Sequence, residues 1–219
     1  MRRGAILFDL DGTLVDSAPD LAGAANELRA LHGRPPLPLE AYRPLAGSGA
    51  RGMLAAGFGL LPSHPDYPSM RAAFLSLYER RLLQSTTVFS AVLPVLARLE
   101  ESGRSWGIVT NKALYLAEPL LAGVRLRHRA AVVVGGDSTP HLKPHPAPLL
   151  HAAHVLGVDA ADCVYVGDDP RDMQAGRAAG MAALAASWGY MGPDARLDEW
   201  GADAVLRVPD DLLNWLGLP

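Results

Sequence analysis

The sequence predicts an α/β fold in which strands of a parallel sheet alternate with helices and a helical segment is inserted after the first strand. From residue 86 onward, short apolar segments alternate with helical patterns, as is typical of parallel sheets with right-handed crossovers. Between residues 17 and 84, no segment has a convincing strand pattern. The first apolar segment stops at Asp9 and Asp11, and because Asp is disfavoured in strands, the two residues indicate a polar task at the strand end.

The composition is that of an ordinary soluble globular protein. The chain of 219 residues suffices for one large domain or a domain with an insertion, and 49% of its residues are hydrophobic while 20% are charged. The formal net charge is -3 and no basic run could follow a phosphate backbone, so we expect no nucleic-acid partner. No uncharged stretch approaches a membrane-spanning length, so no membrane partner is expected. Cys163, the only cysteine, cannot form an internal disulfide, which favours a cytoplasmic location.

The segment 16–85 is predicted to be a helical domain inserted into the fold. Ser17 is a suitable N-cap, Pro19 fits a first helical turn, and apolar residues then recur at helical spacing. Further helical segments are predicted at 38–46, 50–58 and 67–84. Residues 1–15 and 86–219 then form the main domain.

The main domain follows a strand–helix repeat along the rest of the chain. Strand patterns are predicted at 105–110, 131–134, 163–166, 182–186 and, as a last edge strand, 205–208. Helical patterns are predicted at 93–101, 112–122, 146–156 and in a segment that ends at Gly180. Because parallel strands need crossover connections, usually helices, the repeat predicts a Rossmann-like parallel sheet with helices on both faces.

Asp9 and Asp11 stand at the carboxyl end of the first predicted strand, which is where ligands bind in open α/β sheets. Strand alternation places both side chains on the same side, with Leu10 opposite. Two carboxylates this close repel each other unless a cation lies between them or one is protonated. The first case indicates a hard divalent metal such as Mg2+, and the second a nucleophile paired with an acid. The alternative interpretation is structural: Asp9 and Asp11 would form an Asx-type turn at the end of the strand and have no catalytic or binding role.

Polar residues also follow three other predicted strands. They are Thr110, Asn111 and Lys112 after the second strand, Lys143 in the loop after the third, and Asp168, Asp169 and Asp172 after the fourth. Because the carboxyl ends of parallel strands share one sheet edge, the sequence predicts a metal and anion site there, with carboxylates for Mg2+ and donors for an oxyanion such as phosphate. Lys112 and Lys143 are the only lysines among 20 basic residues, which indicates either a need for a compact point charge or chance placement.

Four short motifs resemble the ordered motifs of the haloacid dehalogenase-like (HAD) hydrolase superfamily. They are Asp-Leu-Asp-Gly-Thr-Leu-Val-Asp-Ser from residue 9, Val-Thr-Asn-Lys from residue 109, Lys-Pro from residue 143 and Gly-Asp-Asp-Pro-Arg-Asp from residue 167. The match spans 5–180, and the inserted helices occupy the place of the family's C1-type cap. The wider pattern resembles the phosphoglycolate phosphatase branch, and stretches at 47–52 and 106–112 are also similar to N-acetylmuramic acid 6-phosphate phosphatases.

The resemblance implies a role for each residue that contacts the reacting group. Asp9 would attack phosphorus to form an aspartyl-phosphate, and Asp11 would protonate the leaving alkoxide and then deprotonate the attacking water. Thr110 and Asn111 would hold phosphoryl oxygens. Lys143 would neutralise charge on the phosphoryl group and on Asp9.

The resemblance also implies Mg2+ as the cofactor. Its ligands would be the Asp9 carboxylate, the backbone carbonyl of Asp11 and the Asp168 carboxylate. Asp172 would orient a metal-bound water or Lys143.

Five further residues have less specific signals. Arg51 follows a Gly-Ser-Gly loop and could bind a carboxylate or sugar of the substrate, or lie unengaged on the surface. Lys112 could contact the leaving group or cap a helix. Asp169 is predicted to cap the helix that follows it. Trp188 and Tyr190 follow the last core strand near the same edge, where packing is one interpretation and gating the other.

Together these implications favour a Mg2+-dependent phosphomonoesterase acting on a small phosphorylated metabolite, most closely of the phosphoglycolate phosphatase type. Dehalogenating relatives lack the acid at the position of Asp11, so its presence favours phosphoryl transfer. The alternatives are an N-acetylmuramic acid 6-phosphate phosphatase, a phosphomutase of the β-phosphoglucomutase type and a non-catalytic phosphometabolite-binding protein. The core motifs do not separate phosphatase from mutase, and the sequence leaves monomer and homodimer open.

Overall fold

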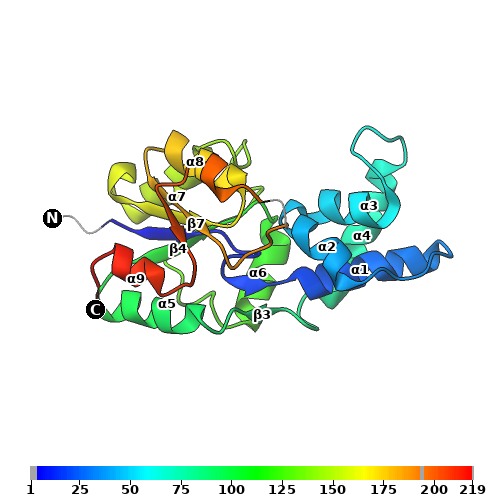
Figure 1. Ribbon diagram of the computed structural model, residues 1–219, viewed down its shortest axis with the longest axis horizontal. Coiled ribbons are helices and arrows are strands. Elements are labelled where there is room, and N and C mark those ends of the chain that lie inside the picture. The colour runs from blue at the N-terminus through cyan, green and yellow to red at the C-terminus, as the bar shows by residue number, and fades with distance from the viewer. Residues whose placement is uncertain (1–3, 193–194, 219) are drawn as a thin grey trace.

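Six parallel strands form the central sheet, in the order β5-β4-β1-β6-β7-β8 (Figure 1). The structure is a computed structural model, and it describes residues 4–192 and 195–218. The strands are β1 (Ile6–Phe8), β4 (Trp106–Val109), β5 (Val133–Val134), β6 (Val164–Gly167), β7 (Ala182–Ala186) and β8 (Ala204–Leu206). Each neighbouring pair runs parallel, so the predicted Rossmann-like sheet is confirmed.

Helices cover both faces of this sheet, as predicted. They are α5 (Val92–Glu101), α6 (Leu114–Gly123), α7 (Ala147–Leu156), α8 (Pro170–Ala178) and α9 (Asp211–Trp215). Successive strand residues point to opposite faces, so Leu7 and Tyr165 pack with α7 and α8, whereas Ile6 and Phe8 pack with α5, α6 and α9. Figure 1 shows α7 and α8 above the sheet and α5 and α9 below it.

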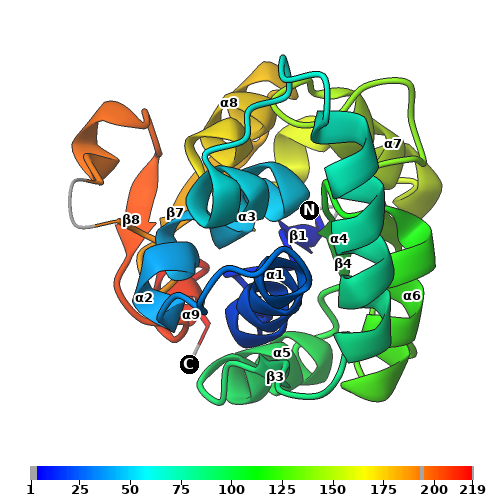
Figure 2. The ribbon, with the colours of Figure 1, turned by 90° about the vertical axis from the view of Figure 1, so that its right-hand side faces the viewer.

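Four helices form a second part of the protein, here called the helical unit. They are α1 (Ala18–Leu31), α2 (Leu39–Tyr42), α3 (Gly49–Phe58) and α4 (Tyr67–Arg81), with the 3-10 helix η1 (Arg43–Ser48) between α2 and α3. Helix α1 contacts each of the other three (Figure 2). The predicted helix 38–46 is divided into α2 and η1, because Pro44 has no N–H for an α-helical hydrogen bond.

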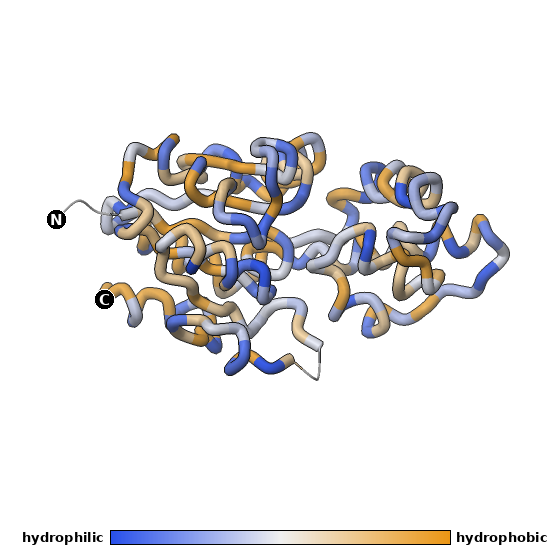
Figure 3. The backbone as a smooth tube through the Cα atoms, turned by 90° about the horizontal axis from the view of Figure 1, so that it is seen from above, coloured by the Kyte–Doolittle hydropathy of each residue, from blue (hydrophilic) through white to orange (hydrophobic). Residues whose placement is uncertain are grey.

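A short antiparallel ribbon connects the sheet to the helical unit. Its strands are β2 (Val15–Asp16) and β3 (Thr87–Val88), which the sequence patterns did not reveal because each has only two residues. Figure 3 shows the two lobes of the protein, with hydrophobic segments running through both. Two further 3-10 helices, η2 (Ala160–Asp162) and η3 (Leu197–Glu199), lie in the loops before β6 and β8. Among the described residues, no helix has the length and apolar character needed to cross a membrane.

Asp20, in the first turn of α1, binds the segment that returns from the helical unit. Its side chain is fully buried. Its Oδ2 accepts hydrogen bonds from the backbone N of Ser85 at 3.0 Å and from the backbone N and the Oγ1 of Thr86, both at 2.8 Å. Both passages between the sheet and the helical unit are therefore joined through one carboxylate.

We expect Asp20→Ala to lower the free energy of unfolding by about 1–3 kcal/mol, because the substitution leaves buried donors without an acceptor. Asp20→Asn keeps one acceptor oxygen and should lose less. Urea unfolding of both variants measures the effect. Wild-type stability in Asp20→Ala would show that these hydrogen bonds do not hold the connection together.

Candidate active site

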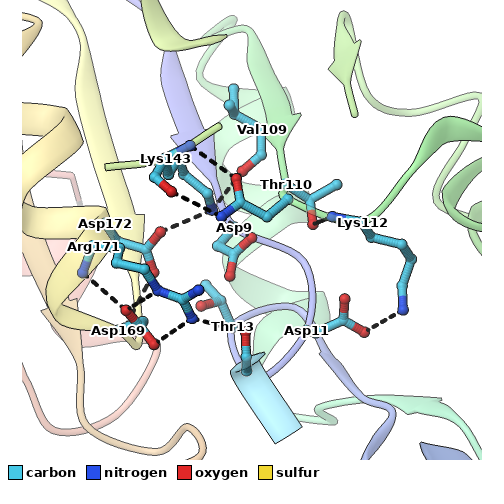
Figure 4. Close-up of polar contacts among 12 residues, drawn as sticks. Asp9, Asp11, Thr13, Val109, Thr110, Lys112, Lys143, Asp169, Arg171 and Asp172 are labelled. Carbon is cyan, nitrogen blue, oxygen red and sulfur yellow. Dashed lines mark hydrogen bonds and ion pairs between the residues drawn. The ribbon is translucent and has the colours of Figure 1, made fainter. Parts of the chain in front are cut away.

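The carboxyl ends of three neighbouring strands place Asp9, Thr110 and Asp168 at one edge of the sheet. Strand β1 ends at Phe8, β4 at Val109 and β6 at Gly167, and β1 lies between the other two. The backbone continues the sheet pairing for one more step, since the N of Asp9 donates to the O of Val166 at 2.9 Å. Residues distant in sequence thus meet at one edge, as predicted (Figure 4).

Lys143 is the central cation of this site. Its Nζ lies 2.8 Å from Oδ1 of Asp9 and 2.8 Å from Oδ1 of Asp172, and it also donates to the Tyr165 hydroxyl at 2.7 Å and to the O of Val109 at 3.0 Å. The side chain is 3% exposed. Burial alone would lower the pKa of Lys143, but the carboxylates of Asp172 and Asp9 raise it to about 12. Lys143 therefore remains protonated under physiological conditions.

Asn111 fixes the backbone of Lys143. Its Nδ2 donates to the O of Lys143 at 3.0 Å, and the N of Lys143 donates to its Oδ1 at 2.9 Å. Thr110 lies beside it, and its Oγ1 accepts a hydrogen bond from the N of Lys112 at 3.1 Å. Both residues line the cavity at the sheet edge. The pairing of Asn111 with Lys143 spans 32 residues, so no local sequence signal could have revealed it.

Three buried carboxylates, among them that of Asp9, form an acidic cluster beside Lys143. One oxygen from each of Asp9, Asp168 and Asp172 lies within 4.8 Å of the others. Burial is the main cause that raises the pKa of Asp9 to about 7, with Asp172 and Asp11 adding to it while Lys143 opposes it. Burial, then the negative charges of Asp9 and Asp172, likewise raise the pKa of Asp168 well above its usual value. The cluster holds more negative charge than Lys143 can balance, and this is the environment of a cation site.

Asp168 is held by two donors, and it lies against two glycines. Thr13 Oγ1 donates to its Oδ1 at 2.9 Å, and the backbone N of Tyr190 donates to its Oδ2 at 2.8 Å. Gly12 has φ +90° and approaches so closely that a Cβ there would lie 2.1 Å from Oδ2 of Asp168. A Cβ at Gly189 would lie 2.2 Å from Cβ of Asp168. Side chains at either glycine would displace this carboxylate.

Asp11 faces the helical unit instead of joining the acidic cluster. Strand β1 ends before both carboxylates, so strand alternation does not determine the direction of Asp11. Its Oδ1 lies 3.1 Å from Nζ of Lys112 and also accepts a hydrogen bond from Oγ of Ser17. Nζ of Lys112 in turn donates to the Tyr78 hydroxyl on α4 at 2.9 Å. Burial would lower the pKa of Lys112, but Asp11 and Tyr78 raise it above its usual range.

Two charged residues at the start of α8 connect the sheet to the helical unit. Asp169 is the N-cap of α8, as predicted, and Asp172 completes a capping box. Arg171 donates to both carboxylate oxygens of Asp169, at 2.7 Å and 2.8 Å. Its Nη2 also donates to the O of Gly47 in η1 at 2.9 Å. The Asp169–Arg171 pair therefore reaches across to the helical unit, which sequence patterns did not indicate.

Tyr190 makes a third connection from the sheet to the helical unit. Its hydroxyl accepts hydrogen bonds from the N of Ser17 at 2.6 Å and the N of Ala18 at 2.9 Å, at the start of α1. Burial raises the pKa of Tyr190 above its usual range, and the charges of Asp11 and Asp16 add to this. Trp188 also contributes, because its Nε1 donates to the O of Thr13 at 3.0 Å. The segment 188–190 therefore joins Asp168 to the first residues of α1.

A cavity of about 550 Å³ opens between the sheet edge and the helical unit. Its lower wall contains Asp9, Asp11, Thr110, Asn111, Lys112, Lys143, Asp169, Arg171 and Asp172. Its upper wall contains Arg51, for which the sequence left substrate binding and a surface position open, and Arg71, which the sequence patterns did not single out. Asp168 lies behind this surface, 4% exposed. The volume is typical of small-molecule sites.

Comparison of the chain with known proteins places it in a family of hydrolases. A family model described as "Haloacid dehalogenase-like hydrolase" matches residues 6–186. The chain therefore belongs to the haloacid dehalogenase-like hydrolases, and the resemblance seen in its motifs is confirmed.

Its relatives narrow the class to phosphatases. A phosphoglycolate phosphatase of Xanthomonas campestris is 46% identical over 212 residues, covering 95% of this chain and 94% of the relative. An N-acetylmuramic acid 6-phosphate phosphatase of Pseudomonas aeruginosa is 38% identical over 216 residues, covering 99% of this chain and 96% of the relative. The crystal structure of a predicted phosphoglycolate phosphatase from Haemophilus somnus matches with a TM-score of 0.86 and 26% identity, covering 99% of each chain. The protein is thus a phosphoric monoester hydrolase of this family.

We expect Gly12→Ala to lower phosphatase activity by about 100-fold or more, because the added methyl group must displace the Asp168 carboxylate and small displacements at a reacting centre are that costly. Gly33→Ala is the matched control. Gly33 also has a left-handed φ, of +67°, but nothing lies within 4 Å of its added Cβ. It should lose about 1–2 kcal/mol of stability and keep its activity. Comparable activity in the two variants would contradict the packing role of Gly12.

Proposed function

We propose that this protein is a Mg2+-dependent phosphomonoesterase that hydrolyses a phosphorylated carboxylic acid through an aspartyl-phosphate on Asp9. The environment of Asp9 carries the proposal. One of its oxygens lies 2.8 Å from the Lys143 ammonium, and the buried carboxylates of Asp168 and Asp172 lie close enough to share a cation with it. A carboxylate placed between a fixed ammonium and a cation site can approach an anionic phosphoryl group without prohibitive repulsion.

The acidic cluster fits Mg2+, which binds oxygen ligands and favours carboxylates. Asp9 and Asp168 would hold it, together with the backbone carbonyl of Asp11. Asp172 is engaged by Lys143 at 2.8 Å and by the backbone N of Asp169 at 3.1 Å, so it would orient its neighbours. When bound, Mg2+ would neutralise charge on the phosphoryl oxygens and on Asp9.

In the first step, a carboxylate oxygen of Asp9 attacks phosphorus, and the ester bond between phosphorus and the leaving oxygen breaks. Lys143 remains protonated beside Asp9 and compensates the negative charge that collects on the phosphoryl oxygens. Thr110 offers a hydroxyl at the same edge. Asn111 keeps Lys143 in place through its backbone, and its second amide hydrogen is available to a phosphoryl oxygen.

Asp11 moves the protons in both steps. It gives a proton to the leaving alkoxide in the first and takes one from the water that attacks the aspartyl-phosphate in the second. Lys112 and Ser17 both present donors to its Oδ1, and these contacts hold the Asp11 carboxylate at the wall of the cavity.

We also propose that residues 16–85 act as a cap domain over the main domain of residues 1–15 and 86–219. The antiparallel ribbon lies at both proposed boundaries, and the cavity lies between the two parts. A cap in this position would exclude bulk water from the aspartyl-phosphate.

The relatives support two substrates, phosphoglycolate and N-acetylmuramic acid 6-phosphate, which have a phosphate ester and a carboxylate in common. Arg51 lines the cavity from the helical unit and supplies a cation for such a carboxylate. The same sheet edge would also serve a phosphomutase, but the relatives named above are phosphatases, which favours water as the final acceptor.

We expect Asp9→Asn to lower phosphate release by about 10³-fold or more and to form no phosphoenzyme, because the nucleophile is lost. Phosphate release from phosphoglycolate, N-acetylmuramic acid 6-phosphate and p-nitrophenyl phosphate should require Mg2+ and stop with EDTA. Mass spectrometry of acid-quenched wild type should find one phosphoryl group on Asp9. Substantial turnover by Asp9→Asn would refute the proposed nucleophile.

We expect Asp11→Asn to lower kcat by about 10²–10⁴-fold, the usual contribution of general acid–base catalysis. With p-nitrophenyl phosphate, whose leaving group needs little protonation, phosphoenzyme should accumulate because water is no longer activated. Asp198→Asn is a suitable control, since Asp198 is exposed and lies in η3, away from the cavity. Unchanged kcat in Asp11→Asn would remove Asp11 from the mechanism.

A further inference from the structure

One face of α4 lines the cavity along most of the helix. The residues on this face are Tyr67, Arg71, Phe74, Leu75 and Tyr78, whose spacing of three and four places them on one side of a helix. Its C-terminal end reaches the catalytic residues, because the Tyr78 hydroxyl contacts Lys112 at 2.9 Å and Lys112 contacts Asp11 at 3.1 Å. Its N-terminal end, at Tyr67, lies about three helical turns before Tyr78. Residues nearer the N-terminal end of this face therefore lie farther from the reaction centre.

Arg71 stands well away from the reaction centre on this face. It precedes Tyr78 by seven residues in an unbroken α-helix. At the α-helical rise, their Cα atoms are about 10 Å apart along the axis. Arg51, from α3, lines the same cavity. Two arginines of the helical unit thus line the cavity whose other wall carries the proposed phosphoryl site.

Within the described part of the chain, neither Arg51 nor Arg71 contacts a carboxylate, a carbonyl or a ring, and this separates them from the other arginines of the helical unit. Those arginines contact a carbonyl, a ring or a carboxylate: Arg29 with Pro35 and Gly57, Arg34 with the Phe58 ring, Arg43 with Asp16, and Arg80 and Arg81 with Glu27. The two arginines without a carboxylate, carbonyl or ring partner are those at the cavity. Cations left available in a cavity suit an anion supplied by a ligand.

The cavity has the character of a sugar-binding surface. Its walls include the aromatic residues Tyr67 and Tyr115 and the apolar residues Leu75 and Leu142, and Leu75 lies between Arg71 and Tyr78 on α4. Such rings pack against the C–H faces of a polar cyclic body, while hydroxyl and backbone groups bind its oxygens. A phosphorylated acid with only one carbon between its two anions would leave Arg71 and much of the cavity of about 550 Å³ unused.

We propose that Arg71, together with Arg51, binds the carboxylate of a substrate that carries its phosphate ester on a sugar-sized body, which makes the substrate a phosphorylated sugar acid. This inference rests on the proposed phosphatase activity and specifies its substrate class. Arg71 acts as a specificity-determining residue through a charge-assisted, bidentate contact with the carboxylate. The phosphate ester lies at Asp9 and Lys143, and the sugar lies along α4.

A matched pair of substrates isolates the carboxylate. N-acetylmuramic acid 6-phosphate carries a lactyl carboxylate that N-acetylglucosamine 6-phosphate lacks. We expect wild type to favour the sugar acid in kcat/KM by about 10–100-fold, the range of a hydrogen-bonded charged contact. In Arg71→Gln, the ratio of the two kcat/KM values should fall by roughly 10-fold or more, and Arg71→Lys should restore only part of it because a single ammonium replaces a planar fork.

Arg80→Gln is the matched control on the same helix. Arg80 is 61% exposed, contacts Glu27 at 3.5 Å and does not line the cavity, so both kcat/KM values should match wild type. A binding measurement free of turnover uses the Asp9→Asn background. There, calorimetry should show weaker binding of N-acetylmuramic acid 6-phosphate when Arg71→Gln is added, and no such change for N-acetylglucosamine 6-phosphate.

Two results would overturn the proposal while leaving the phosphatase activity in place. One is an equal ratio of kcat/KM values in wild type and Arg71→Gln, and the other is a higher kcat/KM for phosphoglycolate than for the sugar acid. Absence of Mg2+-dependent phosphate release from every ester, p-nitrophenyl phosphate included, would instead overturn the phosphatase activity, and the substrate class with it.

Discussion

Three buried carboxylates lie at the sheet edge around one ammonium, and this imbalance of charge is the constraint on which the site depends. Lys143 contacts Asp9 and Asp172 at 2.8 Å each, whereas Asp168 is held, among the residues that the structure describes, only by the neutral donors of Thr13 and Tyr190. Ionised groups are costly to bury unless they are paired and hydrogen-bonded. The raised pKa values of Asp9 and Asp168 express this cost, which either a proton or a divalent cation at the cluster would relieve.

Polar contacts join the helical unit to this charged edge of the sheet. Lys112 joins Asp11 to Tyr78 on α4, Arg171 joins Asp169 to Gly47 in η1, and Tyr190 joins the sheet to the start of α1. Each contact begins at or next to a residue of the proposed chemistry. The position of the helical unit and the geometry of the reacting groups are consequently coupled, so substrate recognition above the sheet and catalysis at its edge are not independent.

The sequence predicts the sheet and its polar edge well. The reason is that the carboxyl ends of parallel strands lie at one edge of the sheet, regardless of the segments that connect the strands. Asp9, Thr110 and Asp168 follow from that rule alone. The contacts of Tyr190 could not be foreseen, since its partners at the start of α1 lie more than 170 residues away. Arg71 resembles any polar helical residue until the fold shows which side of α4 faces the cavity. Local patterns carry strand and helix identity, but partners across domains depend on the whole packing.

The start of α1 has an unusual cap with a consequence for modularity. The Oγ of Ser17, the residue at the N-cap position, is turned to Asp11, and the amides of Ser17 and Ala18 are satisfied by the Tyr190 hydroxyl instead. The backbone amides at the start of α1 thus donate to an acceptor that lies late in the sequence, the Tyr190 hydroxyl. A recombination event or a chimera that exchanged this insertion between relatives would have to carry the residues at 188–190 with it, so the two segments should be inherited as one unit.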